Sequence, residues 1–434
     1  MKPRYLDARA AAAELAIALP TLYAYVSRGL IRSEPGGNAR SRRYRSDDIR
    51  ALKERRHQRR NPARVAQVAL HWGLPVLDSS ISLIADDRLF YRGHDVATLA
   101  TSSPFEEIAA LLWTGNAHAS VFADADPPRA AWQAIARATG AGKRAETPAP
   151  TLLDAFQIAL PLAAVADPSA YDLKPAAVRR TGARIIRLLA ATAVGQPPSA
   201  APVATVLQRG WTPSIASAAA LFQTTLVLCA DHELNASTFT ARCVASTGAT
   251  PYAVVSAGLA ALQGHRHGGA SDRLEALVRE VGAPRDARRV VTARLRRGES
   301  IPGFGHPLYP DSGDPRAPIL LELVQRLRPR APGTLLMRAV LDTVTELVGV
   351  APNLDFGLVA VCRALALPLG SAVGLMALAR TAGWIAHALE QYPDERLIRP
   401  RARYTGAPPA AVVTATPSRP RSTRSRASSP GIAN

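Results

Sequence analysis

The segment IPGFGHPLYPDSGDPR, residues 301–316, places His306 on a loop hinged by glycines, with Arg316 ten residues further on. An imidazole polarises a carbonyl group by donating a hydrogen bond, and a guanidinium binds a carboxylate through two parallel hydrogen bonds. Together the two residue types suit an enzyme that polarises a carbonyl and holds a carboxylate. Glycine and proline mark any tight turn, however, so a loop histidine by itself is more often only solvated.

Three further polar clusters accompany this loop: ADHELNASTF around His232, GHRHGGAS around His267 and APNLDF around Asp355. They interrupt a chain that is otherwise rich in alanine and leucine and reads as helical. Polar residues that act together in such a chain must be brought together by the ends of helices. The sequence therefore predicts one site assembled from several distant helix ends.

In this order the motifs resemble those of the citrate synthase family: a DHE-type histidine, then HGG, a GxGH loop closing with DPR, and N-[hydrophobic]-D. Two later motifs of the family recur as ARTAGWIAH and RPR, and its opening is similar to LFYRGHDVATLA around Tyr91 and to FEEIAALLWTG. The resemblance covers residues 61–406. It implies an all-α fold in which a small helical domain closes over a large one, with a minor β-hairpin predicted at ISLIADDRLFYRG.

The resemblance also implies an acyltransferase that condenses acetyl-CoA with oxaloacetate to give citrate and CoA. Such a reaction removes a proton from a weakly acidic methyl group, and the charge that develops on the thioester oxygen needs a hydrogen-bond donor. By motif, Asp355 is the base, His267 is the donor to the enol, and His306 polarises the 2-oxo acid. General acid–base help of this kind contributes about 10² to 10⁴ in rate per group.

His267 is expected to be neutral. The residues SDRLEALVREV that follow it read as a helix, so His267 should lie just before a helix N-terminus. The positive end of the helix dipole disfavours an imidazolium ion there and leaves a neutral ring able to donate a hydrogen bond. Without the family resemblance, a histidine beside two glycines is more simply read as part of a helix cap.

The substrates need cationic and backbone partners, which the resemblance also supplies. The residues expected to bind the 2-oxo acid are His232, Arg316, Arg380 and Arg399. In the family the last of these arginines reaches into the other subunit, which implies a homodimer. The residues expected to bind CoA are Ile301, Pro302, Gly303, Phe304 and Gly305. No cofactor is expected beyond the acyl-CoA substrate, and no metal, because the His265 and His267 pair lacks an obvious third ligand.

Two positions depart from the family pattern. His265 stands where the family usually has proline, and Leu354 replaces the commoner valine before the aspartate. Neither change removes a functional group. A second histidine at 265 is expected to compete for hydrogen bonds with His267 or to reorient it, which would reduce or redirect activity.

Charge divides the chain into three parts: residues 1–60, the synthase-like residues 61–406, and a tail from 407 to 434. The formal net charge is +19, and residues 1–60 carry 15 basic against 6 acidic residues. The tail is rich in serine, threonine, proline and arginine and cannot pack a core, so it is expected to be disordered.

Residues 1–60 are expected to contain helices at 8–15 and from 20 to about 28, a glycine-bearing loop, and a third helix opened by Ser46. The runs YLDARAAAAELAIALPTLYAYVSRGLI and RRYRSDDIRAL are similar to winged helix-turn-helix modules of the MerR and excisionase type. This resemblance implies that DNA is a possible partner. The helix that carries Thr21, Tyr23 and Tyr25 would face the major groove, and the wing would meet phosphates. Those wing residues are Arg40, Arg42 and Arg43. The alternative is a packing or dimerisation element whose arginines keep it in solution.

The composition is that of a globular protein, with 47% hydrophobic and 20% charged residues. The most apolar stretch, 358–379, is interrupted by Arg363, Pro368 and Gly370, which predicts a buried helix pair and no membrane segment. The N-terminus lacks the apolar run of a secretory signal, so a cytoplasmic location is expected. Cys229, Cys243 and Cys362 have no CxxC spacing and are expected to be reduced packing residues.

Two alternative functions stay open. A 2-methylcitrate synthase would use propionyl-CoA, and one methylene shifts such discrimination by only about 1 to 3 kcal/mol. A regulator would bind DNA through residues 1–60 and use the synthase-like body to sense a metabolite. The intact set of His267, His306 and Asp355 favours catalysis, because sensing does not require a base.

Overall fold

A computed structural model describes residues 5–27, 30–36, 42–46, 48–49, 52, 77–123, 129–140, 150–310 and 312–407. The sequence predictions made for Arg40, for the junction at residues 60–61 and for the tail from 408 to 434 lie outside these residues. Within them the protein is mostly helical, as the sequence predicts, with two small antiparallel sheets.

The N-terminal residues form their own small hydrophobic core around Leu22, Ile31, Tyr44 and Ile49. Its elements are β1 (Tyr5–Leu6), α1 (Ala8–Glu14), α2 (Leu19–Ser27), β2 (Ser33–Pro35) and β3 (Arg42–Arg45). Helices α1 and α2 meet at 95°, and the strands pair in the order β1-β3-β2. The first two of the three expected helices are present, and the third, opened by Ser46, lies mostly outside the described residues, of which Ser46, Asp48, Ile49 and Leu52 are helical. The expected loop instead begins and ends in paired strands, because Tyr44 in β3 is buried against the helices.

The predicted hairpin is present as β4 (Ser82–Ala85) and β5 (Arg88–Tyr91), extended by β6 (His94–Asp95). Asp86 and Asp87 at its tip both have positive φ, which is the backbone of a tight two-residue hairpin turn. This turn sets the register and places Ser82 directly opposite Tyr91.

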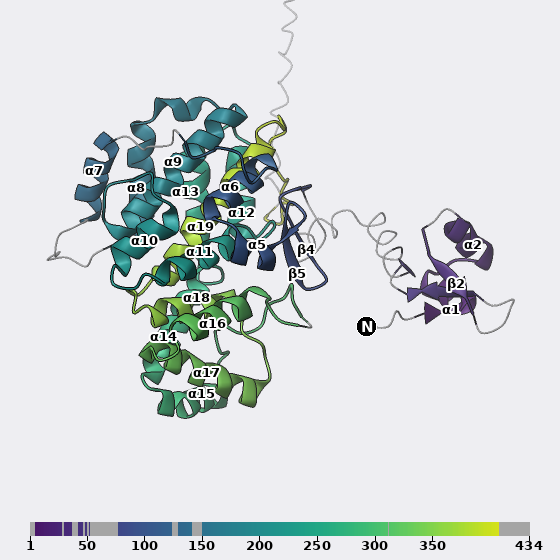
Figure 1. The fold of residues 1–434 in the computed structure, drawn as a ribbon. Helices are drawn as coiled ribbons and strands as arrows, with labels where there is room; N and C mark the ends of the chain where they lie inside the picture. The colour runs from purple at the N-terminus through teal and green to yellow at the C-terminus, as the bar shows by residue number, and fades with distance from the viewer. Residues whose placement is uncertain are drawn as a thin grey trace, which may run out of the picture.

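Helices build the rest of the protein in two groups, which Figure 1 shows as an upper and a lower lobe. The larger group contains α5 (Val96–Ser102), α6 (Phe105–Thr114), α7 (Arg129–Thr139), α8 (Leu152–Val165), α9 (Pro175–Val194), α10 (Val203–Trp211), α11 (Ala218–Cys229), α12 (Ala236–Ala245), α13 (Pro251–Leu262) and α19 (Ser371–Gln391). The smaller group contains α14 (Gly269–Val281), α15 (Ala287–Arg296), α16 (Arg316–Leu327), α17 (Pro332–Val348) and α18 (Leu354–Ala364). Short 3₁₀ turns lie at Pro168–Tyr171 and Pro284–Asp286.

The apolar stretch at residues 358–379 is the predicted helix pair, divided between α18 and α19 on either side of Gly370. Among the described helices, α19 alone is long and apolar enough to cross a membrane, and 94% of its apolar window is buried within the protein. Burial of this kind is typical of a core helix. Cys229 and Cys362 are buried and Cys243 is partly buried, and all three are free thiols, as expected.

Candidate active site

Two of the predicted histidines meet at the junction of the two helix groups. The rings of His232 and His306 stand edge to face with their centroids 5.3 Å apart. Tyr309, which sequence analysis did not single out, joins them: its hydroxyl lies 2.9 Å from His232 Nε2, and its ring centroid is 5.0 Å from that of His306. Burial and the cations of Arg316 and Arg380 hold the pKa of His232 well below its usual range.

His306 is also neutral near pH 7. Burial, with the nearby Arg316 cation, lowers its pKa to about 4. The backbone N–H of Leu308 donates to Nδ1 at 3.2 Å. The neutral ring therefore carries its proton on Nε2.

Arg316 is held in a buried ion pair at the start of α16. Its Nε and Nη2 atoms donate to the two oxygens of Asp314 at 2.9 and 2.8 Å, and both side chains are almost wholly buried. Burial would raise the pKa of Asp314, but Arg316 outweighs that effect and keeps the carboxylate charged. The same carboxylate accepts the backbone N–H of Leu354 at 3.0 Å, which ties this pair to the start of α18.

Asp355 occupies the first turn of α18. Asn353 caps the helix by accepting the N–H groups of Asp355 and Phe356, so the capping residue of the NLD motif fixes where the aspartate stands. The Ser271 hydroxyl of α14 donates to Asp355 Oδ1 at 2.5 Å. Burial raises the pKa of Asp355 to about 6, against the opposing effect of Ser271. The carboxylate is therefore ionised at pH 7 but more basic than an exposed one.

His267 lies immediately before Gly268, the residue that precedes α14, as predicted. Its Nε2 is 2.9 Å from the Ser237 hydroxyl, and its pKa falls to about 4. The expected neutral ring is present, but burial and then the Arg380 cation lower this pKa, whereas the prediction invoked the helix dipole. His265 is exposed and makes no hydrogen bond within the described residues, so it does not compete for the Ser237 hydroxyl that His267 contacts. An effect of His265 on activity stays a prediction.

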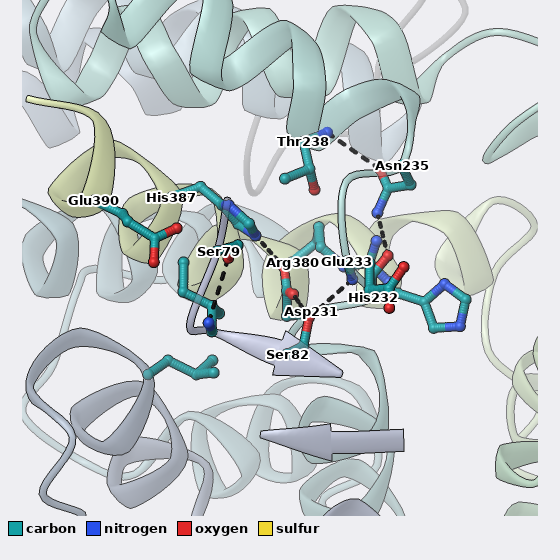
Figure 2. A network of polar contacts seen from close by, with 12 residues as sticks. Ser79, Ser82, Asp231, His232, Glu233, Asn235, Thr238, Arg380, His387 and Glu390 are labelled. Atoms are coloured by element: carbon teal, nitrogen blue, oxygen red, sulfur yellow. Dashed lines mark hydrogen bonds and ion pairs between the residues drawn. The ribbon is translucent and has the colours of Figure 1, made fainter. Parts of the chain in front are cut away.

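Arg380 lies in the middle of α19 and is buried with 3% of its surface exposed. Among the described residues its side chain makes one hydrogen bond, from Nε to the carbonyl of Cys229 at 2.8 Å. Figure 2 shows it beside Asp231, at the turn that carries His232. A buried guanidinium with unpaired Nη groups is suited to binding an incoming carboxylate.

The loop at Ile301, Pro302, Gly303, Phe304 and Gly305 packs against the segment that leads into α18. Gly303 and Gly305 have positive φ, which explains the need for glycine. The Gly305 N–H donates to the Ala351 carbonyl at 2.9 Å, and the Gly303 carbonyl accepts the Asn353 N–H at 2.9 Å. The ring of Phe304 contacts that of Phe356 with centroids 5.0 Å apart. This loop and the Asp355 helix therefore form one unit.

Arg399 is a predicted site residue that stays exposed in this single chain. It lies on the irregular segment after α19, is exposed, and makes no hydrogen bond or ion pair with the described residues. Sequence analysis missed four residues that bond to the predicted site residues: Tyr309, Asp314, Ser271 and Ser237. Tyr309 and Asp314 stand within the quoted 301–316 segment, so proximity to His306 and Arg316 was the available signal.

The described part of the chain contains no cluster of three or more histidine, cysteine or acidic side chains positioned to hold a metal ion. The groups that gather at the site are instead neutral imidazoles, two arginines and one carboxylate of raised pKa. This set can remove a proton, donate hydrogen bonds to oxygen and bind carboxylates.

Comparisons with known proteins agree with these features. The family model "Citrate synthase, C-terminal domain" matches residues 69–401. Citrate synthase 2 of Bacillus subtilis is 33% identical over 77% of this chain and 94% of its own length. A 2-methylcitrate synthase of Mycobacterium tuberculosis is 29% identical over 77% of this chain and 89% of its own length.

Solved structures show the same fold. The citrate synthase of Thermotoga maritima matches with a TM-score of 0.64 and 25% identity, covering 78% of this chain and 95% of that one. The Thermoplasma acidophilum citrate synthase, in ternary complex with carboxymethyl coenzyme A and oxaloacetate, matches with a TM-score of 0.66 and 24% identity, covering 78% and 96%. On the family match, the shared fold and the gathered motif residues, the chain belongs to the citrate synthase family of acyltransferases.

Proposed function

We propose that this protein condenses acetyl-CoA with oxaloacetate to give citrate and CoA. The observation that carries the proposal is Asp355: a carboxyl at a helix start, with a pKa of about 6, in a site whose histidines are neutral. A general base works best when its pKa lies near the working pH. The ternary complex of the Thermoplasma relative holds oxaloacetate and a CoA derivative on the same fold, which supports this choice of substrates.

In the first step the Asp355 carboxylate takes a proton from the acyl methyl group, and the C–H electrons form the carbon–carbon double bond of an enolate, whose oxygen carries the charge. His267 donates a hydrogen bond to the thioester oxygen, where the charge develops. If the Ser237 hydroxyl donates to Nε2, the neutral ring of His267 carries its own proton on Nδ1. A neutral imidazole is the appropriate donor, and the low pKa of His267 keeps it neutral at pH 7.

In the second step the enolate carbon attacks the ketone carbon of oxaloacetate. His306, whose proton lies on Nε2, polarises the ketone oxygen and donates that proton to it as the carbon–carbon bond forms. Asp355 then releases the proton that it took, and His306 regains one from solvent, so that both groups return to their starting states. His232, Arg316 and Arg380 bind the 2-oxo acid. Water then hydrolyses the thioester, which releases CoA and leaves citrate.

The two arginines play different parts in this proposal. Arg316 is already paired with Asp314, so it offers a fixed positive field. Arg380 keeps only its Nε engaged within the described residues, so it is able to bind a substrate carboxylate through both Nη atoms. The CoA moiety lies along the loop of residues 301–305.

The third arginine comes, in this proposal, from a second copy of the chain. Arg399 is exposed and has no assigned role in the site of its own chain. The family resemblance instead gives the RPR motif a role across a subunit interface. We therefore propose a homodimer in which each subunit contributes Arg399 to the other's oxaloacetate site.

Release of free CoA thiol tests this proposal. With oxaloacetate present, purified protein should release thiol from acetyl-CoA faster than from propionyl-CoA and form citrate. The variant Arg399→Ala should need more oxaloacetate for half-maximal rate while its requirement for acetyl-CoA stays unchanged. A faster reaction with propionyl-CoA would identify a 2-methylcitrate synthase, and no thiol release from either donor would contradict the proposal.

A second candidate function, DNA binding, rests on the N-terminal residues. Helix α2 presents Tyr23 with 51% of its surface exposed. A concave surface of about 640 Å³ between α1, α2 and β3 has Arg9, Arg42, Tyr23 and Tyr44 in its lining, together with one acidic residue, Asp7. Basic and aromatic side chains around one concavity suit a phosphate backbone. We propose that this surface binds duplex DNA.

Salt dependence tests DNA binding by the full chain. Fluorescence anisotropy with a labelled duplex should give an affinity that falls with salt, with a log–log slope of about −0.9 for each phosphate contacted. Replacing Arg42 and Arg43 with alanine should reduce the magnitude of that slope by about 2. Absence of binding at low salt would show that the N-terminal residues serve packing or assembly.

A further inference from the structure

The turn that carries His232 has an unfavourable backbone. Glu233, the next residue, has φ of +51°. This value lies in the left-handed region of backbone conformation, which residues other than glycine and asparagine rarely adopt. Such a residue persists only when its surroundings hold it there. His232 itself is 7% exposed and contacts Tyr309. Whatever holds the turn therefore also sets the direction of His232.

Ser82 of the β4–β5 hairpin holds the turn from one side. Its hydroxyl donates to Asp231 Oδ2 at 2.5 Å and accepts the backbone N–H of Glu233 at 2.9 Å. Two residues further along β4, the Ile84 N–H donates to the Glu233 carboxylate at 3.0 Å. Figure 2 shows Ser82 on its strand, directly below Asp231.

Tyr91, which stands opposite Ser82 in the hairpin, holds the same turn. Its side chain is fully buried, and its hydroxyl accepts the Asp231 N–H at 3.1 Å. The same hydroxyl lies 3.0 Å from the Asp231 carbonyl and 3.1 Å from the Val227 carbonyl, either of which accepts its proton. One cross-strand pair thus bonds the backbone N–H of Asp231, its carboxylate and the N–H of Glu233.

Helix α19 closes the turn from the other side. The Gly383 N–H donates to the Ala230 carbonyl at 3.0 Å, and a Cβ at position 383 would meet that carbonyl and the Asp231 carboxylate. His387 Nε2 lies 3.4 Å from Asp231 Oδ1. Burial would raise the pKa of Asp231, but His387, Arg380 and Ser82 outweigh it, so the carboxylate stays ionised. Asp231 is therefore a fixed acceptor for Ser82.

We propose that Ser82 and Tyr91 are positioning residues for oxaloacetate binding: the hairpin pair keeps the strained Asp231–Glu233 turn in place and thereby aims His232 at the 2-oxo acid. Neither residue touches the reacting atoms. The inference rests on the proposed function for the identity of the ligand. It goes beyond that function by assigning a role to the β-hairpin, which otherwise serves only the fold.

Two variants with matched controls test the proposal. Ser82→Ala removes a hydroxyl that donates to a buried carboxylate. Its control is Ser169→Ala: Ser169 is more exposed, but its hydroxyl also donates to a buried carboxylate, that of Asp167, at 2.5 Å. Tyr91→Phe removes a buried phenol hydroxyl, and Tyr252→Phe removes another, bonded to Asp167 at 3.1 Å. Thermal unfolding of all four variants measures how much stability is lost when each hydrogen-bonded hydroxyl is removed.

A positioning role predicts that the KM for oxaloacetate changes while the KM for acetyl-CoA does not. Ser82→Ala and Tyr91→Phe should raise the KM and the calorimetric Kd for oxaloacetate by about tenfold or more, because small misplacements of a binding group have large effects. The KM for acetyl-CoA should change by less than about twofold, and the control variants should bind oxaloacetate like the wild type. A merely structural role would lower the fraction of active protein and leave the KM values for both substrates unchanged. That result would overturn the proposal.

Failure of the proposed function is distinguishable from failure of this inference. If the wild type binds oxaloacetate without releasing thiol, the proposed reaction is wrong and the binding constants alone decide the role of the hairpin. If it binds none, imidazole ¹⁵N–¹H spectra decide, with His232→Ala assigning the signal. The His232 signal should shift in Ser82→Ala and Tyr91→Phe but not in the controls. In that case an unshifted His232 signal in both variants overturns the proposal.

Discussion

Replacing Asp355 with asparagine should lower kcat by a factor of about 10² to 10⁴, because the amide cannot accept the proton that the reaction must remove. The substitution keeps the side chain's shape and its oxygen, so the Ser271 hydroxyl retains an acceptor. Oxaloacetate binding should persist, because it depends on His232, Arg316 and Arg380. The measurement is initial thiol release at saturating substrates, with oxaloacetate binding followed by calorimetry.

The same variant should be at least as stable as the wild type above pH 6. The pKa of Asp355 is about 6 in the folded protein and lower when the chain is unfolded. Stability associated with this group is therefore present at low pH and is lost as pH rises through 6, where a buried charge appears. Asparagine avoids that cost. Asp272→Asn is the control: partial desolvation also raises the pKa of Asp272, but this side chain is exposed and makes no hydrogen bond to the site among the described residues. An Asp355→Asn enzyme as active as this control would contradict the role of Asp355 as the base.

Replacing Arg316 with methionine should lower the free energy of unfolding at pH 7 by about 3 to 5 kcal/mol. The reason is that Asp314 would remain buried as a charge without its cation. Of the bonds to that carboxylate, only backbone N–H donors such as Leu354 would be left. Urea unfolding measures the loss, and activity should fall too, because the field that holds the 2-oxo acid is removed.

The double variant Asp314→Asn with Arg316→Met should recover part of that loss, since no uncompensated charge remains. Arg396→Ala serves as the control, because its ion pair with Asp394 is exposed and exposed pairs contribute little. If the single and double variants lose the same stability, or if Arg316→Met loses as little as Arg396→Ala, an unpaired Asp314 charge is not what destabilises the Arg316→Met variant.

Local sequence signals predicted much of the fold that positions the site. Asp86 and Asp87 indicated the hairpin turn, and the glycines after His267 marked the start of α14. The break near Gly370 divided the apolar stretch into α18 and α19. Each of these features depends on residues within a few positions of one another, which is the range over which turn and capping chemistry acts.

The partners of the site residues were not predictable in the same way. Ser271 and Asp355 are 84 residues apart, and Ser82 and Asp231 are 149 apart. A serine in the sequence carries no sign of the distant carboxylate that it will meet, since packing of whole helices decides the pair. For the same reason the low pKa of His267 was attributed to the local helix dipole, whereas burial and Arg380, 113 positions later, are its causes.

Exchange of the acyl methyl protons tests the central claim most directly. The protein is placed in D₂O with acetyl-CoA and a 2-hydroxy analogue of oxaloacetate, which fills the site but has no ketone to attack. The wild type should exchange methyl protons for deuterons at a rate that rises as pH passes through about 6, the pKa of Asp355. Asp355→Asn should show no exchange above the uncatalysed rate. Exchange by Asp355→Asn at the wild-type rate would contradict the assignment of Asp355 as the base.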